Sequence, residues 1–135
     1  MIEKIIYEED LLAIIVRKNY EKEGISFITP NEYTLQLGYM SHPEGHVIQP
    51  HLHHPVPRKT TGTQEVIVVK KGVVQIDFYS FNKKYIESRE LREGDVILLI
   101  SAGHGFTMLE PTTLIEVKNG PYIPEEDKEK FERNI

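Results

Sequence analysis

Short apolar runs rich in β-branched residues recur along the whole chain, separated by glycine, proline, asparagine or charged residues. The alternation is clearest where Val74, Ile76 and Phe78 share one face of a strand, while Gln75 and Asp77 are predicted to face the other way. Many short strands at this spacing favour an all-β sandwich or barrel. The runs predicted to be strands are 2–7, 11–17, 25–29, 35–40, 66–70, 73–79, 85–91, 96–100 and 113–117.

Turn residues set the boundaries of several predicted strands. Residues 70–72 and 80–83 predict two tight hairpins, and residues 93–95 predict a third turn. The run that follows, 96–100, is apolar throughout, so we predict a strand that is buried on both faces.

The end of the chain carries the only helical pattern. Pro124 followed by three acidic residues suits a helix N-terminus, and the pattern extends over 124–134. No repeat or linker divides the sequence, so we predict one domain over 1–135. Its N-terminal strands lie within 2–17, and its C-terminal tail, 119–135, carries a short helix.

Composition narrows the functional classes. A chain of 135 residues with 39% hydrophobic and 27% charged residues is typical of a soluble globular domain. Its net charge of −5 argues against a nucleic-acid partner. The absence of cysteine excludes disulfides, thiolate metal ligands and a cysteine nucleophile. The apolar run 11–16 is too short and too acidic in its flanks for a signal peptide or membrane span, so we predict no membrane association and a cytoplasmic location.

Two histidines on an extended segment are the first sign of chemistry. His51 and His53 are bracketed by Pro50 and Pro55, which favour extended backbone. Alternation along such a segment places both imidazoles on the same side. Glu65, at the start of a predicted strand, adds a carboxylate, and this donor set suits a divalent transition metal.

The spacing of these residues resembles the first motif of the cupin superfamily, which are small jelly-roll (double-stranded β-helix) proteins. That motif has a glycine, five residues, His-x-His, a short gap, a glutamate, six residues and a glycine. The residues that match it are Gly45, His51, His53, Glu65 and Gly72. The gap before the glutamate is longer here, because eleven residues, 54–64, stand where the family has three or four.

A second cupin motif is matched less completely. Gly94-Asp95 fits its Gly-Asp strand start, whereas Ser101 replaces the expected proline and the spacing to His104 is shortened. The resemblance covers about residues 35–118 and implies a single-domain jelly-roll barrel. It also implies that one metal ion is bound inside the barrel by His51, His53, Glu65 and His104. Such a donor set leaves a position open for water or substrate and does not distinguish Fe, Mn, Ni, Co and Zn.

Other polar residues near the motif are candidate substrate contacts. His46 precedes the histidine pair and could line the pocket, and Arg58 in the inserted segment suits an anionic group. Gln64, beside Glu65, could donate a hydrogen bond to a ligand or to the substrate. An ordinary exposed position remains the alternative for each of these residues.

Function is predicted from the resemblance, since the scaffold hosts many chemistries. Segments 37–40 and 117–122 are similar to single-domain cupins of cell-surface polysaccharide and unusual-sugar pathways. This implies a metal-dependent isomerase or epimerase acting on a sugar, sugar phosphate or nucleotide-linked sugar. An Fe(II)-dependent dioxygenase of a small polar substrate and a non-catalytic ligand- or metal-binding protein are the alternatives. The family also implies a homodimer, with strands 2–7 and 11–17 as candidates for exchange or packing.

Overall fold

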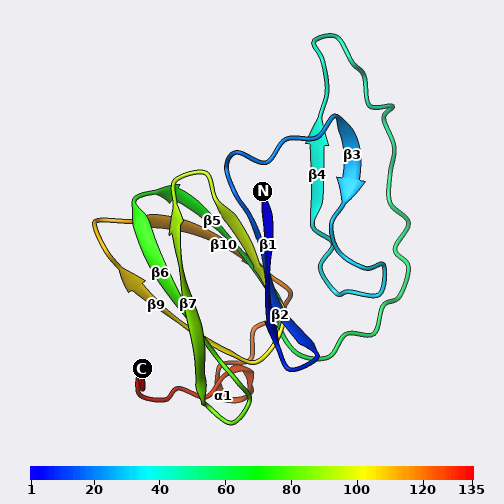
Figure 1. Ribbon diagram of the computed structural model, residues 1–135. Coiled ribbons are helices and arrows are strands. Elements are labelled where there is room, and N and C mark those ends of the chain that lie inside the picture. The colour runs from blue at the N-terminus through cyan, green and yellow to red at the C-terminus, as the bar shows by residue number, and fades with distance from the viewer.

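The computed structural model describes residues 1–135 and consists mainly of β-strands (Figure 1). The all-β class and the short C-terminal helix are confirmed, and no sheet closes on itself. The elements are β1 (Ile2–Tyr7), β2 (Asp10–Val16), β3 (Gly24–Phe27), β4 (Gly38–Ser41), β5 (Glu65–Lys71), β6 (Val73–Tyr79), β7 (Tyr85–Arg92), β8 (Val96–Leu99), β9 (Gly103–Met108), β10 (Thr113–Lys118) and α1 (Pro124–Asp127).

The strands form three antiparallel sheets. A five-stranded sheet has the order β1-β2-β8-β5-β10, and a three-stranded sheet has the order β7-β6-β9. The third sheet is the β3–β4 hairpin. The two larger sheets face each other and enclose one hydrophobic core, to which both contribute. Strands far apart in sequence are therefore brought together at the edges of this sandwich.

The core follows the predicted alternation. Ile67 and Val69 of the larger sheet lie in one cluster with Val74, Ile76 and Phe78 of the smaller sheet, and each is at most 3% exposed. Burying an aliphatic or aromatic side chain of this size stabilises the fold by about 1.5–3 kcal/mol. Strand β8 is buried on both faces as predicted, since the successive residues Ile97 and Leu98 are both 0% exposed.

The turn at residues 70–72 differs from the prediction. The predicted hairpin between β5 and β6 is wrong. Strand β5 pairs with β8 and β10, whereas β6 pairs with β7 and β9 in the other sheet. The chain instead crosses from one sheet to the other at Gly72. Its φ of 94° and the Pro111 carbonyl oxygen, only 2.4 Å from where a Cβ would stand, require glycine there. The hairpin at 80–83 is confirmed, since β6 pairs with β7.

Two further boundaries differ from the sequence-based expectation. Strand β9 was not predicted, because the glycine-flanked segment Gly103–Gly105 has the composition of a turn. The helix was predicted over 124–134 but ends at Asp127, and Lys128 has extended backbone with φ of −153°. The tail beyond Asp127 lies against the smaller sheet, and these contacts compete with further helical turns.

The tail is held on the outer face of the smaller sheet by an ion pair between an exposed arginine and a buried aspartate. Arg133 Nε lies 3.0 Å from Oδ2 of Asp77, whose side chain is 2% exposed. The Phe131 ring packs edge-on against Tyr79 with centroids 5.0 Å apart. Burial opposes ionisation of Asp77, but hydrogen bonds from Ser88, Gln75 and Arg133 outweigh it and leave the Asp77 pKa below its usual value.

One side of the sandwich is closed by ion pairs, and we call it the closed edge. Arg17, directly after β2, donates from Nε to Glu3 on β1 at 2.7 Å and from Nη1 to Asp95 at 3.1 Å. Arg89 on β7 reaches the same Glu3 at 2.7 Å and so links the two sheets. The hydrogen bond from Arg17, with help from Arg89, holds the Glu3 pKa below its ordinary range.

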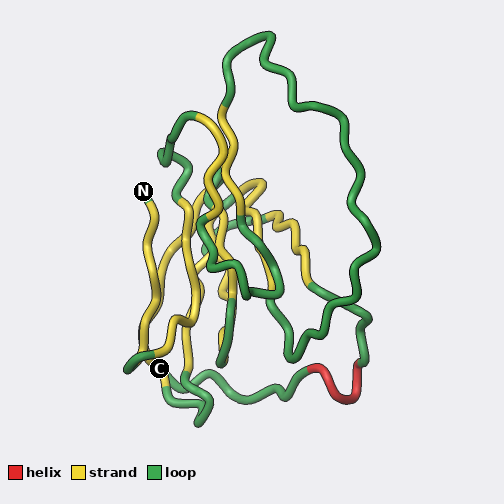
Figure 2. The backbone as a smooth tube through the Cα atoms, turned by 90° about the vertical axis from the view of Figure 1, so that its right-hand side faces the viewer, coloured by secondary structure: helices red, strands yellow, loops and turns green.

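One segment stands away from the sandwich. Residues 42–64, which we call the arm, contain no helix or strand and run from the β3–β4 hairpin back to the start of β5 (Figure 2). Each residue from 43 to 62 is exposed. The arm is fastened at its end, where Asn119 accepts from the Gln64 amide at 2.8 Å and donates to the Gly62 carbonyl at 3.1 Å. No helix of the chain has the length and apolar character needed to cross a bilayer.

Candidate functional site

Glu65 and His104 meet where the two large sheets approach each other. Glu65 is the first residue of β5, and alternation along the strand places it on the same face as the core residue Ile67. His104 on β9 pairs with Phe78 of β6, so it also faces the space between the sheets. Its Nε2 lies 3.2 Å from Oε2 of Glu65, and the two side chains are 28% and 16% exposed. A half-buried imidazole–carboxylate pair therefore lies within reach of solvent.

A second carboxylate joins this pair from β10. Glu116 is in register with Ile67, which places it on the inner face beside Glu65. A hydrogen bond to Glu65, with burial and charge repulsion from Glu65, raises the Glu116 pKa. The Glu65 pKa is lowered, chiefly by its hydrogen bond with His104. The site thus holds an ionised carboxylate next to one that retains its proton more readily.

Lys118 supplies the positive charge of the site. It is the register partner of Glu65 on β10 and helps to lower the Glu65 pKa. Its Nζ lies 4.5 Å from the centre of the Tyr122 ring and 3.8 Å from Asp127 of α1. Residues just before and within the short helix therefore hold the ammonium group close to the two carboxylates.

The structure brings together two of the four predicted metal ligands. His51 and His53 lie on the exposed arm, with ring centroids 5.2 Å apart, and His51 Nδ1 is 2.8 Å from the Gln49 carbonyl oxygen. No group of three or more histidine, aspartate or glutamate side chains has a geometry that could hold a metal ion. The predicted quartet is therefore present as two separate pairs.

The predicted substrate contacts lie in different places. His46 stacks on His42 with centroids 4.0 Å apart, at the beginning of the arm. Arg58 is exposed further along the arm. The Gln64 side-chain oxygen accepts a hydrogen bond from the Leu35 amide at 3.0 Å, which fastens the arm to the segment before β4. Of the three, Gln64 alone adjoins the Glu65–His104 pair, and its amide is engaged in that structural contact.

Sequence reasoning missed Glu116 and Lys118. The alternation in 113–117 indicates a strand but does not say which strand lies beside it. Only the antiparallel pairing of β10 with β5 places these charges next to Glu65. An acid and a base two residues apart on an edge strand are usually solvated, so local sequence gave no sign of their role.

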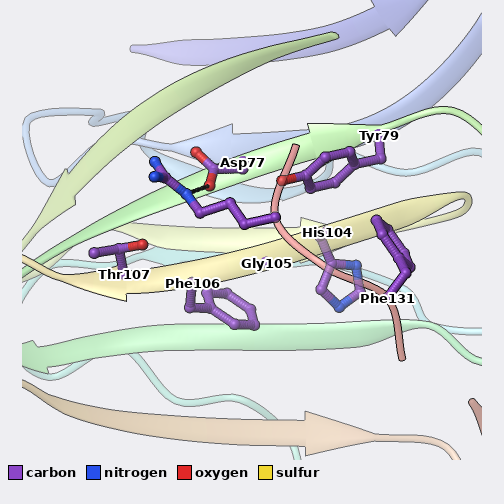
Figure 3. A pocket seen from close by; sticks show the side chains of 8 residues that line it. Asp77, Tyr79, His104, Gly105, Phe106, Thr107 and Phe131 are labelled. Carbon is purple, nitrogen blue, oxygen red and sulfur yellow. Dashed lines mark hydrogen bonds and ion pairs between the residues drawn. The ribbon is translucent and has the colours of Figure 1, made fainter. Parts of the chain in front are cut away.

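A small pocket lies along the other side of β9. It has a volume of about 130 Å³ and is lined by Asp77, Tyr79, His104, Gly105, Phe106, Thr107, Phe131 and Arg133. In Figure 3, Asp77 and Tyr79 lie on one side of β9, whereas His104 and Phe106 project from the other side. The tail residues Phe131 and Arg133 close this pocket, so His104 lies between the tail and the Glu65 cluster.

Comparison with known proteins finds no family model, no curated protein and no solved structure that matches this chain.

Proposed function

We propose that this chain is a small cupin-type enzyme that transfers protons on a polar carbonyl-bearing substrate, as an isomerase or epimerase does. The observation that carries the proposal is the contact of His104 with Glu65 beside Glu116, at the solvent-accessible side of the sandwich. Carboxylates whose pKa values move in opposite directions are a frequent sign of divided acid and base roles. The proposed jelly-roll relationship rests on the motif spacing and on the two facing sheets.

In this mechanism His104 is the base and Glu65 positions it. A carboxylate 3.2 Å from Nε2 fixes the ring orientation and favours a proton on that nitrogen. The Nδ1 atom is then free to accept a proton from the carbon next to a substrate carbonyl. The Glu65 charge stabilises the imidazolium that forms, which makes proton removal easier.

Glu116 and Lys118 act on the developing oxyanion. Glu116, with its raised pKa, is the group that can donate a proton to the carbonyl oxygen. The Lys118 ammonium attracts negative charge on that oxygen or on a neighbouring anionic group. Returning the proton to the same carbon from the opposite side, while the enol oxygen gives its proton back to Glu116, would give an epimer. If that carbon bears a hydroxyl, returning the proton to the former carbonyl carbon, while this hydroxyl loses its proton to Glu116 and becomes the new carbonyl, would give an isomer. A sugar derivative with a ketone provides both the carbonyl and the acidic C–H bond.

The divalent metal predicted from the motif remains a prediction, and no step above passes through it. The two imidazoles of the arm and the Glu65–His104 pair contain suitable nitrogen and oxygen donors, but they do not share a centre. Elemental analysis of the purified protein tests this point directly. Near-stoichiometric metal that is lost in the double variant His51→Ala, His53→Ala would support the quartet, and its retention would reject it.

Solvent deuterium exchange tests the proposed reaction. The protein is incubated in deuterated water with a panel of nucleotide-linked keto sugars, and proton NMR follows loss of the signal next to the carbonyl. We expect exchange or isomerisation of at least one substrate and a fall of about 100-fold or more in His104→Gln, since general acid–base groups contribute about 10²–10⁴-fold. The control is Lys4→Gln, which replaces an exposed side chain on β1, outside the site.

The same assay separates the alternatives. Turnover that requires Fe(II) and oxygen would favour the dioxygenase, and saturable binding without exchange would favour a non-catalytic binder. Equal exchange in wild type and His104→Gln would remove the proposed base.

A further inference from the structure

The arm has the properties of a segment that binds another surface. Its internal backbone hydrogen bonds are local, from His46 to Pro43 and from Val56 to His54, so most of its backbone donors and acceptors are unpaired within the chain. Apolar side chains accompany this open backbone. Val47 is 76% exposed, Leu52 74% and Val56 56%. Extended backbone with exposed apolar side chains suits addition to the edge of a sheet.

The opposite side of the sandwich offers such edges. Strands β9 and β10 each end their sheet and have no partner on their outer side. Phe106 and Met108 on β9 are 37% and 48% exposed and lie on the same face as His104. We call the space between β9 and β10 the open edge. An unpaired, partly apolar edge is a liability that proteins commonly cover.

Charge also matches between the two surfaces. Residues 45–64 of the arm contain Arg58, Lys59 and four histidines but no acidic residue, in a chain whose net charge is −5. The open edge contains two carboxylates, Glu65 and Glu116, and one ammonium group, Lys118, so acidic groups are in excess there. An arm lying across this edge would place cationic and imidazole groups beside acidic ones, which favours the pairing.

The arm is directed away from the open edge of its own chain. In Figure 1 the arm passes on the right of the molecule, whereas β9 lies on the left. The hairpin at one end and the Asn119 hydrogen bonds at the other hold it on that side. A second copy related by a two-fold axis can receive the arm and return its own, so both open edges are covered at once.

We propose that two copies of this chain exchange arms, so that residues 46–61 of one copy lie along the β9–β10 open edge of the other. The dimer contact is then the arm and not the N-terminal strands β1 and β2, which are already paired within the larger sheet. His51 and His53 of one copy lie beside Glu65 and His104 of the other, and each site contains residues from both chains. This arrangement does not depend on the proposed reaction.

Cysteine cross-linking tests the exchange cleanly, because the chain has no cysteine. Leu52→Cys and Phe106→Cys are made as separate variants, one of them enlarged by a tag, and are refolded together. A short bis-maleimide is then added. We expect a covalent heterodimer on denaturing gels and a dimer mass by light scattering. The matched control replaces the Phe106 variant with Phe81→Cys, which is exposed in the β6–β7 hairpin and not on β9 or β10.

Each outcome decides the proposal. A heterodimer formed with Phe106→Cys and not with Phe81→Cys supports arm exchange. A bridge within one chain in the double variant Leu52→Cys, Phe106→Cys would show that the arm closes on its own body, and would overturn it. Equal cross-linking with both partners, or a monomer mass throughout, would also overturn it. Leu52→Asp with Val56→Asp should weaken the dimer at least about tenfold while the circular dichroism spectrum is kept.

Discussion

The two edges of the sandwich use charged residues in opposite ways. At the closed edge, Arg17 and Arg89 alternate with Glu3 and Asp95, so each charge contacts one of opposite sign. At the open edge, Glu65 and Glu116 are neighbours and share a proton-sensitive contact, with His104 and Lys118 beside them. Paired opposite charges favour one rigid arrangement. Neighbouring like charges raise the energy of the folded state and are retained where their protonation is useful.

This difference shows which polar cluster is structural. Asp95 is 6% exposed and accepts hydrogen bonds from the Lys18 amide, the Arg92 amide and the Arg17 side chain. It therefore fixes the turn before β8 and the end of β2. The Glu65 carboxylate, in contrast, contacts groups that gain or lose protons, and no backbone donor holds it. The closed edge therefore has the contacts of a stabilising cluster, whereas the open edge is where the proposed reaction would take place.

The largest stability effect is expected at the closed edge. Asp95→Ala should lower the free energy of unfolding by about 2–4 kcal/mol, because two backbone amides in partly buried hydrogen bonds and a guanidinium lose their acceptor. Urea unfolding followed by circular dichroism measures this loss. Glu93→Ala in the same turn is the matched control, since Glu93 is exposed, and it should change stability by less than about 0.5 kcal/mol. Equal losses in both variants would contradict the assigned role of Asp95.

A smaller loss of stability is expected at the closed edge when the pH is lowered. The folded-state pKa of Glu3 is lowered, so its contribution is present above the unfolded pKa and is lost as the pH falls through the folded value. Stability should therefore decline in this acidic range, and less so in Glu3→Gln. Urea midpoints at a series of pH values test this expectation. Parallel pH profiles of wild type and Glu3→Gln would refute it.

The open edge should respond to pH with the opposite sign. The Glu116 pKa is raised, so its contribution is present below the unfolded pKa and is lost as the pH rises through the folded value. Glu116→Gln removes the repulsion from Glu65 and should increase stability at neutral pH, by only about 0.5 kcal/mol because the side chain is exposed. Thermal unfolding at neutral and acidic pH measures it. A loss of stability in Glu116→Gln at neutral pH would show that the Glu65 and Glu116 carboxylates do not destabilise the fold by repelling each other.

The smallest effect on folding is expected for His104→Gln, at less than about 0.5 kcal/mol. The side chain is partly exposed, and its one close polar partner, Glu65, remains accessible to water. The same variant is expected to lose exchange activity. His104→Gln should therefore affect activity but not stability, whereas Asp95→Ala should lower stability. A loss of stability as large as that of Asp95→Ala would place His104 among the structural residues.

Sequence predicted the elements better than their assembly. Alternation at Val74, Ile76 and Phe78 identified core positions, because a strand between two sheets leaves one face in contact with the opposing sheet. Strand β9 was not recognised from the sequence, because Gly103 and Gly105 have no side chains that could show an alternating pattern. For the site, Glu65 and His104 were predicted and lie together, while Glu116 and Lys118 required the β5–β10 register. No local pattern encodes that long-range pairing.

The ion pair between Arg133 and Asp77 has a practical consequence for handling the protein. Removing the last few residues would leave a deeply buried carboxylate facing the β-sheet without its cation. Shortened versions should then precipitate or express poorly, even though the lost segment contributes no strand.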